Sequence, residues 1–309
     1  MEHHTFDIVI IGGGPGGLSA ALVASRARRS VLVLDEGSPR NRTAHDAHGF
    51  ISREGINPLE LREIARAEVT GFGAEISTAR VASVVREDGA FRIETDGGDT
   101  VTAGYVVVAT GLRDELPAVP GLQENWGVEV ILCPYCHGWE VKDRRLGVLA
   151  NDVRSLHQVQ LIRQWSSDVT LFTHDLAEPD VEDAARLNAR GIRRVPGRVE
   201  RVERREKGLV IVRDDGETEV DALFIAPRFV PNDEILLSLG AETEDTPMGR
   251  FVRTDGTGAT TVPGLWAVGN VADPGSLIVH AASMGSKAAS AINMQLVEAD
   301  IERAVAGLR

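Results

Sequence analysis

The sequence predicts an α/β protein built from two Rossmann-like, three-layer ββα domains. Two observations support this fold class. Residues 6–36 run through an apolar strand, a glycine-rich turn, a helix of small residues and a second apolar strand. A similar alternation of strands and helices resumes at residue 146. The 309 residues are enough for two domains, at about 100 to 200 residues per domain.

The N-terminal unit carries a G-x-G-x-x-G motif between its first strand and its first helix. Gly12 suits the tight turn, Gly14 lets a pyrophosphate approach the backbone, and Gly17 lets the helix lie close on the strand. The start of the helix offers unpaired N–H groups and the positive end of its dipole to the phosphates. The complete turn reads Gly12-Gly13-Gly14-Pro15-Gly16-Gly17.

The second strand of this unit, residues 31–34, ends in Asp35 and Glu36. An acid at this point is placed to accept hydrogen bonds from ribose hydroxyls. A glycine turn alone is weak evidence, because it can be purely structural. Here the strand, the turn, the helix and the terminal acid all lie where the binding mechanism needs them, so the motif predicts a dinucleotide site.

The rest of the chain is expected to alternate in the same way. A loop over 38–58 could face a cofactor, and a helix follows from 59 to about 72. Short strands near 76 and at 81–85, 91–95 and 100–102 suggest a small meander, followed by a buried strand at 105–109. The second unit is expected to have strands at 146–150, 169–173, 193–195, 199–204, 209–213 and 222–226 and helices at 155–165 and 181–189. The pattern changes near residue 245, and a long helix covers about 278–297.

Composition and charge exclude several classes of partner. The 33 basic residues against 46 acidic ones give a net charge of −13, which opposes binding to a phosphate backbone, so no nucleic acid is expected. No apolar stretch approaches the roughly 18 residues of a membrane span. The N-terminus lacks the positively charged region and the small-residue cleavage site of a signal peptide, so we expect a cytoplasmic protein.

The chain has two cysteines, Cys133 and Cys136, in a Cys-x-x-Cys motif. A single pair excludes a disulfide framework, and a structural disulfide is rare in a reducing cytoplasm. A zinc site would need two further ligands from histidines that lack metal-binding spacing, so no metal is expected. A redox-active dithiol is the remaining interpretation.

The chain resembles the low-molecular-weight thioredoxin reductases in four motifs and in their order. These are the glycine turn, Ala109-Thr110-Gly111, the Cys-x-x-Cys motif and the segment 264–270. The resemblance spans nearly the whole chain. It implies an FAD domain in two pieces, 1–113 and 245–309, with an inserted NADPH-type domain, 114–244, that carries the cysteines. It also implies a homodimer. In this family FAD binds the first glycine turn, and the resemblance extends its site to Thr110, Gly111, Gly269, Asn270 and His280.

The inserted domain departs from the family at its own nucleotide turn. The family has a glycine-rich turn there, whereas the strand 146–150 continues as Asn151-Asp152-Val153-Arg154-Ser155. Side chains at the glycine positions block a close backbone approach, and Asp152 adds a negative charge beside the expected pyrophosphate. The family's basic cluster for the 2′-phosphate is replaced by residues 172–178, which contain two acids and no arginine. We therefore expect that NADPH is not the physiological reductant.

Two further departures lie near the predicted flavin. The family has an aspartate acid/base after the second cysteine, and this chain has His137. This exchange, with the lost NADPH site, resembles the dithiol oxidases of the gliotoxin and holomycin type. Asn270 replaces an aspartate that contacts the flavin ribityl chain in the family, and an amide still donates and accepts there.

The resemblance implies an FAD-dependent dithiol:disulfide oxidoreductase, an oxidase that passes electrons to O₂ and yields H₂O₂. A substrate dithiol attacks Cys133, Cys136 faces the flavin, and His137 accepts a proton. One alternative is a disulfide reductase that acts on a thioredoxin-like protein and is fed by NADPH or ferredoxin. A second alternative is a flavin and thiol redox sensor without enzymatic activity.

Several side chains keep two interpretations. His137 is either the base or a helix cap, and His280 either stabilises reduced flavin or caps the last helix. Tyr135 and Trp139 either form an aromatic wall for the substrate or only pack. His45 and His48 are interpreted as ordinary loop histidines.

Overall fold

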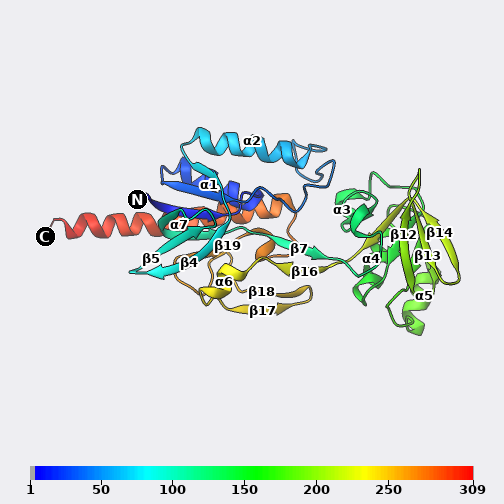
Figure 1. Ribbon diagram of the computed structural model, residues 1–309. Helices are drawn as coiled ribbons and strands as arrows, with labels where there is room; N and C mark the ends of the chain where they lie inside the picture. Colours follow the sequence, from blue (N-terminus) through cyan, green and yellow to red (C-terminus); the bar gives the residue numbers. More distant parts are fainter. Residues whose placement is uncertain (1–3, 309) are drawn as a thin grey trace. The chain divides into compact units, whose positions relative to one another are not determined.

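The computed structural model describes residues 4–308, which divide into two compact units (Figure 1). The first unit contains residues 4–42, 58–113 and 229–308, and the second contains residues 43–57 and 114–228. The chain leaves the first unit along strand β7 (Leu112–Glu115) and returns along β16 (Arg228–Pro231). These two strands pair with each other.

The units differ from the expected domain limits at two places. The chain returns to the first unit at Phe229 and not at residue 245, because helix α6 (Glu234–Ser238) buries Leu236 in the first unit's core. Residues 43–57 lie in the second unit and not with the N-terminal segment. An isolated bridge between Ala47 and Ile56 closes this loop. Thr43 packs closely on Gly127, because a Cβ added at Gly127 would lie 2.3 Å from the Thr43 Oγ1.

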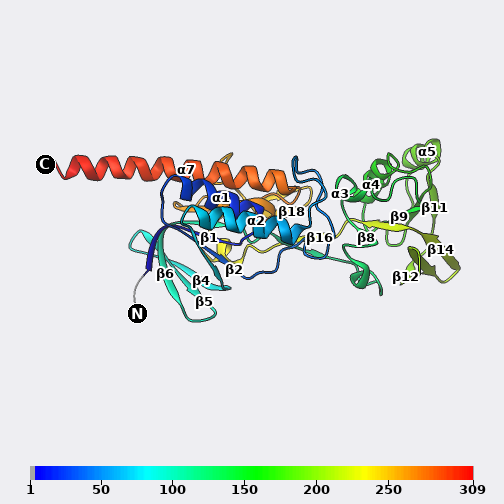
Figure 2. The ribbon, with the colours of Figure 1, turned by 90° about the horizontal axis from the view of Figure 1, so that it is seen from above.

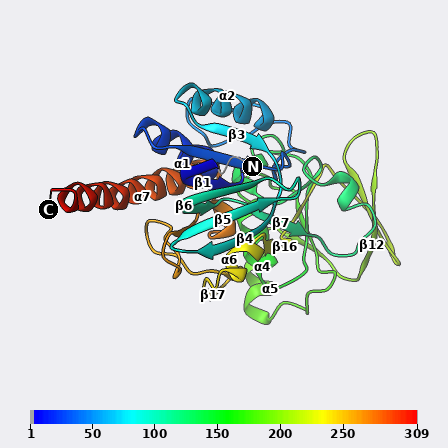
Figure 3. The same cartoon turned by 60° about the vertical axis from the view of Figure 1, so that its left-hand side comes forward.

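One mixed sheet forms the centre of the first unit. Its order is β3-β2-β1-β6-β5-β4, and β19 also pairs with β6. The pairs on the β3 side and the β19 pair are parallel, whereas β4, β5 and β6 form the antiparallel ribbon seen in Figure 3. The strands are β1 (His4–Ile11), β2 (Val31–Asp35), β3 (Glu75–Thr78), β4 (Val81–Glu87), β5 (Ala90–Thr95), β6 (Thr100–Val108) and β19 (Leu265–Ala267).

Two expectations for this sheet were wrong in detail. The strand near Ile76 is not part of the meander, because β3 pairs with β2 in parallel. The strands expected at 100–102 and 105–109 are one strand, β6, since Gly104 does not interrupt the pairing with β1. The ribbon of β4 to β6 therefore extends directly from the parallel part of the same sheet.

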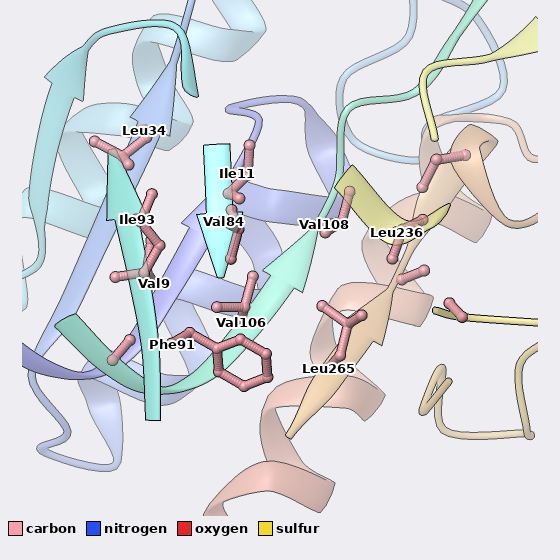
Figure 4. Packing of buried hydrophobic residues seen from close by; sticks show 14 of the residues in the cluster. Val9, Ile11, Leu34, Val84, Phe91, Ile93, Val106, Val108, Leu236 and Leu265 are labelled. Atoms are coloured by element: carbon pink, nitrogen blue, oxygen red, sulfur yellow. The ribbon is translucent and has the colours of Figure 1, made fainter. Parts of the chain in front are cut away.

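Apolar residues cover both faces of the first sheet. Along β1, Val9 and Ile11 join the cluster of Figure 4, where Phe91, Val106 and Leu265 pack against them. The alternate residues Ile8 and Ile10 point to the other face and pack against the helices. This alternation gives a sheet that is buried on both sides, as expected for a parallel α/β domain.

Helices α1 (Pro15–Arg26), α2 (Pro58–Gly71) and α7 (Ile278–Ala306) belong to the first unit. Helix α7 lies along α1 (Figure 2). Gly285 allows this approach, because a Cβ there would lie 1.9 Å from the Gly16 carbonyl oxygen. Helix α7 extends beyond the expected end near residue 297 to Ala306, and Ile301 and Val305 on that extension are exposed. The first unit also contains η2 (Gly269–Val271) and the hairpin of β17 (Thr243–Thr246) and β18 (Gly249–Val252).

The second unit has a parallel sheet of order β11-β10-β9-β15-β8 and an antiparallel sheet of order β12-β13-β14. Strands β8 and β14 were not expected, because β8 has two residues and the sequence of β14 is polar. The strands are β8 (Val130–Ile131), β9 (Leu146–Leu149), β10 (Val169–Phe172), β11 (Arg193–Val195), β12 (Val199–Arg204), β13 (Leu209–Arg213), β14 (Gly216–Val220) and β15 (Ala222–Ile225). The helices are η1 (Gln123–Asn125), α3 (Pro134–His137), α4 (Arg154–Ile162) and α5 (Val181–Ala189).

The predicted class, α/β with Rossmann-like parallel sheets, is confirmed. In a parallel sheet all carboxyl ends meet at one edge, where ligands bind in such folds. In the second unit this edge brings together the turn after β8, which carries the cysteines, and the turn after β9. Among residues 4–308, no helix is long and apolar enough to cross a membrane.

Candidate active site

The turn after β1 needs glycine at its first and last positions. Gly12 has φ 109°, and a Cβ there would lie 2.4 Å from the Ala109 carbonyl oxygen. A Cβ at Gly17 would lie 1.9 Å from the Gly12 carbonyl oxygen. These distances are far below contact, so the close packing of turn, strand and helix requires both glycines.

Gly14 has a different environment. A Cβ at this position would meet no protein atom within 4 Å. Gly14 is the N-cap of α1, which has Pro15 in its first turn, no side-chain cap and no acidic residue there. The start of α1 therefore presents backbone N–H groups to an open space, as pyrophosphate binding requires. A Cβ added at Gly16 would lie 3.3 Å from the Ala281 carbonyl oxygen of α7.

Asp35 lies at the end of β2, next to this turn. Its side chain is buried and accepts a hydrogen bond from the Arg62 guanidinium of α2, with Arg66 Nη1 3.8 Å away. Burial alone would raise the pKa of Asp35, but the bond from Arg62 and those from the Gly13 and Gly37 N–H groups lower it. Asp35 is therefore an ionised acceptor, suited to ribose hydroxyls.

The neighbouring acid, Glu36, lies outside this network. Its side chain is exposed and its carboxylate is 4.0 Å from Arg80 Nε. Arg62 was not predicted as a partner of Asp35, because it lies on α2, 27 positions along the chain.

Thr110 and Gly111 lie in the short connection between β6 and β7. Both are hydrogen-bonded by Asn232, a residue that was not predicted from the sequence. Thr110 Oγ1 donates to the Asn232 carbonyl at 2.6 Å, and the Asn232 amide donates to the Thr110 carbonyl at 2.9 Å. Gly111 has φ 70°, and its carbonyl accepts from the Asn232 N–H at 3.0 Å. Asn232 thus fixes the turn that the sequence predicts for the cofactor site.

The segment before α7 is organised by Asn270, which follows Gly269 at φ 73°. The Asn270 amide nitrogen donates to the carbonyls of Asp273, Pro274 and Ser276 at 3.1, 3.2 and 3.0 Å. Its Oδ1 accepts from Arg40 Nη1 at 3.4 Å. An aspartate could not donate these bonds, which explains why an amide occupies the position.

His280 lies in the first turn of α7. Its Nδ1 accepts a hydrogen bond from the Leu277 N–H at 3.3 Å. This contact corresponds to the capping interpretation of His280. It also makes Nδ1 an acceptor, so Nε2 carries the proton of the neutral ring.

These residues fit an FAD-type dinucleotide. An open helix start without a competing side chain suits the pyrophosphate, and an ionised carboxylate at the end of β2 suits a ribose. In contrast, the residues described include no group of three or more His, Cys, Asp or Glu side chains that could hold a metal ion.

The two cysteines lie on the turn after β8. Both are half-buried, and the Cys133 carbonyl accepts from the N–H groups of Cys136 and His137, each at 3.1 Å. Gln158 of α4 supports this turn by donating to the Leu132 carbonyl at 3.1 Å. Backbone and helix contacts thus hold the motif in a single short turn.

Aromatic side chains flank the cysteines. Tyr135 and Trp139 are about two-thirds exposed, at 66% and 67%. Tyr135 packs edge-on against Trp165, and the Lys142 ammonium lies 3.1 Å above the Trp139 ring. Both rings therefore retain an accessible surface next to the dithiol turn.

His137 ends α3, directly after Cys136. Burial lowers the pKa of His137, and the nearby His48 lowers it further, while Glu140, the Cys133 backbone and Asp46 oppose the shift. Its Nδ1 is buried and has no hydrogen-bond partner among the described residues. The ring is therefore neutral near pH 7, the state that accepts a proton.

The turn after β9 is closed by its own side chains. Asp152 accepts from the Arg154 N–H at 2.8 Å and from Arg154 Nε at 2.9 Å. Asn151 donates to the Ala226 carbonyl at 2.7 Å. Burial would raise the pKa of Asp152, but the bonds from Arg154 lower it, so a carboxylate occupies the start of α4.

The loop after β10, residues 173–178, is also tied down. The His174 side chain is buried, its Nδ1 accepts from the Val199 N–H at 3.0 Å, and its Nε2 lies 3.1 Å from Asp175. Residues 173–178 themselves contain no arginine or lysine that could bind a 2′-phosphate.

The chain belongs to the pyridine nucleotide-disulphide oxidoreductase family, which matches residues 6–285. The resemblance to thioredoxin reductase-like flavoproteins is confirmed, and so are the flavin-dependent oxidoreductase class and FAD as the cofactor of the family.

Among the relatives, a thioredoxin reductase named aclD from Aspergillus oryzae is 29% identical over 96% of this chain and 98% of its own length. A probable thioredoxin reductase from Arthroderma benhamiae is 34% identical over 60% of this chain, and the match spans 47% of that protein. Of the solved structures, HlmI has 44% identity and a TM-score of 0.92, covering 98% of this chain and 96% of its own. An oxidoreductase from Agrobacterium tumefaciens has 35% identity and a TM-score of 0.90, covering 95% and 99%.

Proposed function

We propose that the protein is an FAD-dependent dithiol oxidase, which joins two thiols of a small molecule as a disulfide and passes the electrons to O₂ to give H₂O₂. The observation that supports the proposal is the start of α4, where the Asp152 carboxylate accepts hydrogen bonds from the Arg154 N–H and Nε at the point where a nicotinamide-binding unit has a glycine turn. Without an NADPH site, the dithiol itself becomes the source of electrons.

The sulfur chemistry of the proposal begins with the Cys133–Cys136 disulfide. A substrate thiolate attacks Cys133, which forms a substrate–Cys133 bond and releases Cys136 as a thiolate. The second substrate thiol then attacks the substrate sulfur, closes the product disulfide and releases Cys133 as a thiolate. FAD held on the turn of Gly12 to Gly17 would supply the two-electron chemistry that couples the reduced cysteine pair to oxygen.

His137 has the role of general base in this scheme. Each substrate thiol must lose a proton before it attacks, and a neutral imidazole accepts a proton near neutral pH. The burial that lowers the pKa of His137 keeps the ring neutral and ready for this step. Its position directly after Cys136 supports transfer from a thiol at the same turn.

The exposed rings of Tyr135 and Trp139 support a small apolar substrate, because they provide stacking surface next to the cysteines. A second candidate is reduction of a thioredoxin-like protein, favoured by the names of the curated relatives. It requires NADPH or ferredoxin as the electron donor, and the Asp152 carboxylate at the start of α4 argues against NADPH. The homodimer and the cytoplasmic location expected from the sequence stay predictions.

Oxygen consumption with dithiothreitol tests the proposal. We expect many turnovers, with one H₂O₂ formed for each dithiol oxidised. A Cys136→Ser variant should keep its flavin and lose turnover, whereas Ser155→Ala, outside the motif, should keep both. A single turnover in the wild type would indicate a sensor, and full turnover of Cys136→Ser would contradict the mechanism.

A further inference from the structure

His48 lies in a clamp of two carboxylates in the second unit. Its Nδ1 is 2.7 Å from Glu54 Oε1, and its Nε2 is 3.5 Å from Glu140 Oε1. The His48 side chain is 14% exposed. Both ring nitrogens therefore face a carboxylate, and the ring orientation is fixed from two sides, which an ordinary loop histidine does not need.

The clamp is itself anchored. The second oxygen of Glu54 accepts from the Gly49 N–H at 2.9 Å, and the hydrogen bond with His48 lowers the pKa of the Glu54 carboxyl. The bridge between Ala47 and Ile56 holds the two ends of this loop together. The backbone thus keeps Glu54 in place as an ionised partner of His48.

The clamp also reaches the dithiol turn. Glu140, which contacts His48, also follows His137 by three residues. Its charge raises the pKa of His137 and so opposes the effect of burial. The charged groups that act on His137 are His48 and Asp46 from the 43–57 loop and Glu140 from its own segment, and the Cys133 backbone also contributes. Among these groups, His48 is the one whose charge lowers the pKa of His137.

We propose that His48, held between Glu54 and Glu140, is a positioning residue that sets the charge state of His137 during thiol oxidation. This inference rests on the proposed function for the role of His137 as the base. When His48 is protonated, its charge disfavours a second positive charge on His137 and so keeps the base neutral at lower pH. Glu140 acts in the opposite direction, because a carboxylate stabilises an imidazolium.

The opposite charges give variants with opposite effects. His48→Gln should move the acid limb of the pH profile of kcat/KM to higher pH by about half a unit, which lowers kcat/KM about threefold on that limb. Glu140→Gln should move the limb to lower pH by a similar amount. Glu54→Gln should act like His48→Gln but more weakly, since it loosens the clamp without removing the ring.

The experiment measures kcat/KM for dithiothreitol across pH in the FAD-loaded protein, and a histidine NMR titration of the same variants with ¹⁵N-labelled rings. His137→Gln assigns the His137 signal. The matched control is His45→Gln, because the His45 side chain is exposed and only its carbonyl accepts a bond, from Asn57 at 3.0 Å. This control should leave both the pH profile and the His137 titration unchanged.

Shifts of opposite sign for His48→Gln and Glu140→Gln, with cancellation in the double variant, would support the inference. Shifts of the same sign, or none, in a wild-type background that oxidises dithiothreitol would overturn it. If the wild type does not oxidise dithiols but the NMR shifts still have opposite signs, the proposed function fails and the charge coupling stands. If His48→Gln does not fold, the sign of the shift is taken from Glu54→Gln, which should fold because the Glu54 side chain is exposed.

Discussion

The two turns that precede helices α1 and α4 begin alike and end differently. Each follows a buried parallel strand, but the turn before α1 has glycines and an open helix start, whereas the turn before α4 carries Asp152 bonded to Arg154. The N–H groups at a helix start need acceptors: the start of α1 leaves them open, as a phosphate would require, whereas Asp152 accepts from one of them at the start of α4. On the proposed function, the second Rossmann-like unit keeps its fold without binding a dinucleotide.

The largest effect is expected at Gly17. A Gly17→Ala substitution puts a Cβ 1.9 Å from the Gly12 carbonyl oxygen, so the strand, turn and helix cannot pack. We expect a loss of about 3 kcal/mol or more in the free energy of unfolding, together with loss of the flavin. Denaturant unfolding and visible absorbance measure both effects. The control is Gly71→Ala, whose Cβ meets nothing within 4 Å; equal damage in both variants would contradict the packing argument.

A smaller and more selective effect is expected at Gly14. Because a Cβ there meets no protein atom within 4 Å, Gly14→Ala should fold normally. The methyl group would instead occupy the space of the pyrophosphate, and FAD affinity should fall about tenfold to a hundredfold, or about 1.4 to 2.7 kcal/mol. Fluorescence titration of the apoprotein with FAD measures the change. Unaltered affinity would mean that the phosphates do not lie on this turn.

The second turn is expected to respond in stability and not in cofactor binding. Asp152→Asn should cost about 1 kcal/mol of the free energy of unfolding at pH 7, because it weakens the acceptor of the Arg154 N–H and Nε at the start of α4. The pKa of Asp152 is lowered in the folded state, so its contribution is present above the unfolded pKa of about 3.9 and is lost as pH falls through the folded pKa.

Urea unfolding at several pH values checks this prediction. The wild-type and Asp152→Asn curves should differ at pH 7 and converge in acid. Asp214→Asn, an exposed aspartate on the same unit, should match the wild type throughout. A constant difference at all pH values would exclude the carboxylate as the source.

The smallest effect is expected at the start of α7. His280→Ala removes the acceptor for the Leu277 N–H and should cost about 0.5 to 1 kcal/mol, measured as a decrease in Tm. His280→Asn keeps an acceptor and should recover most of the loss. If His280→Ala has the wild-type Tm and yet slows dithiol oxidation, the interpretation of His280 as a flavin contact is favoured over the cap.

The parts of the fold that follow from local sequence were predictable. Period-two and apolar runs predicted β1, β2, β9 and β10, and the glycine motif predicted the open turn before α1, because these features depend on neighbouring residues. Asn151 and Asp152, which stand where thioredoxin reductases have a glycine-rich turn, likewise indicated that the turn before α4 differs from that of the family. The structure adds that Asp152 fills that turn with Arg154.

Contacts between distant segments were not predictable in this way. Arg62 reaches Asp35 across 27 positions, and Asn232 reaches Thr110 across 122. The 43–57 loop has no periodicity, so its membership of the second unit and the clamp around His48 depend on tertiary packing. Residues 229–244 likewise join the first unit through contacts between distant segments, among them the packing of Leu236 from α6 into its core.

Anaerobic reduction of the bound flavin tests the central claim most directly. Under argon, dithiothreitol should bleach the visible absorbance of the holoenzyme in a stoichiometric titration, while NADPH should leave it oxidised, because Asp152 and Arg154 occupy the start of α4. Rapid bleaching by stoichiometric NADPH, with no bleaching by the dithiol, would contradict the account.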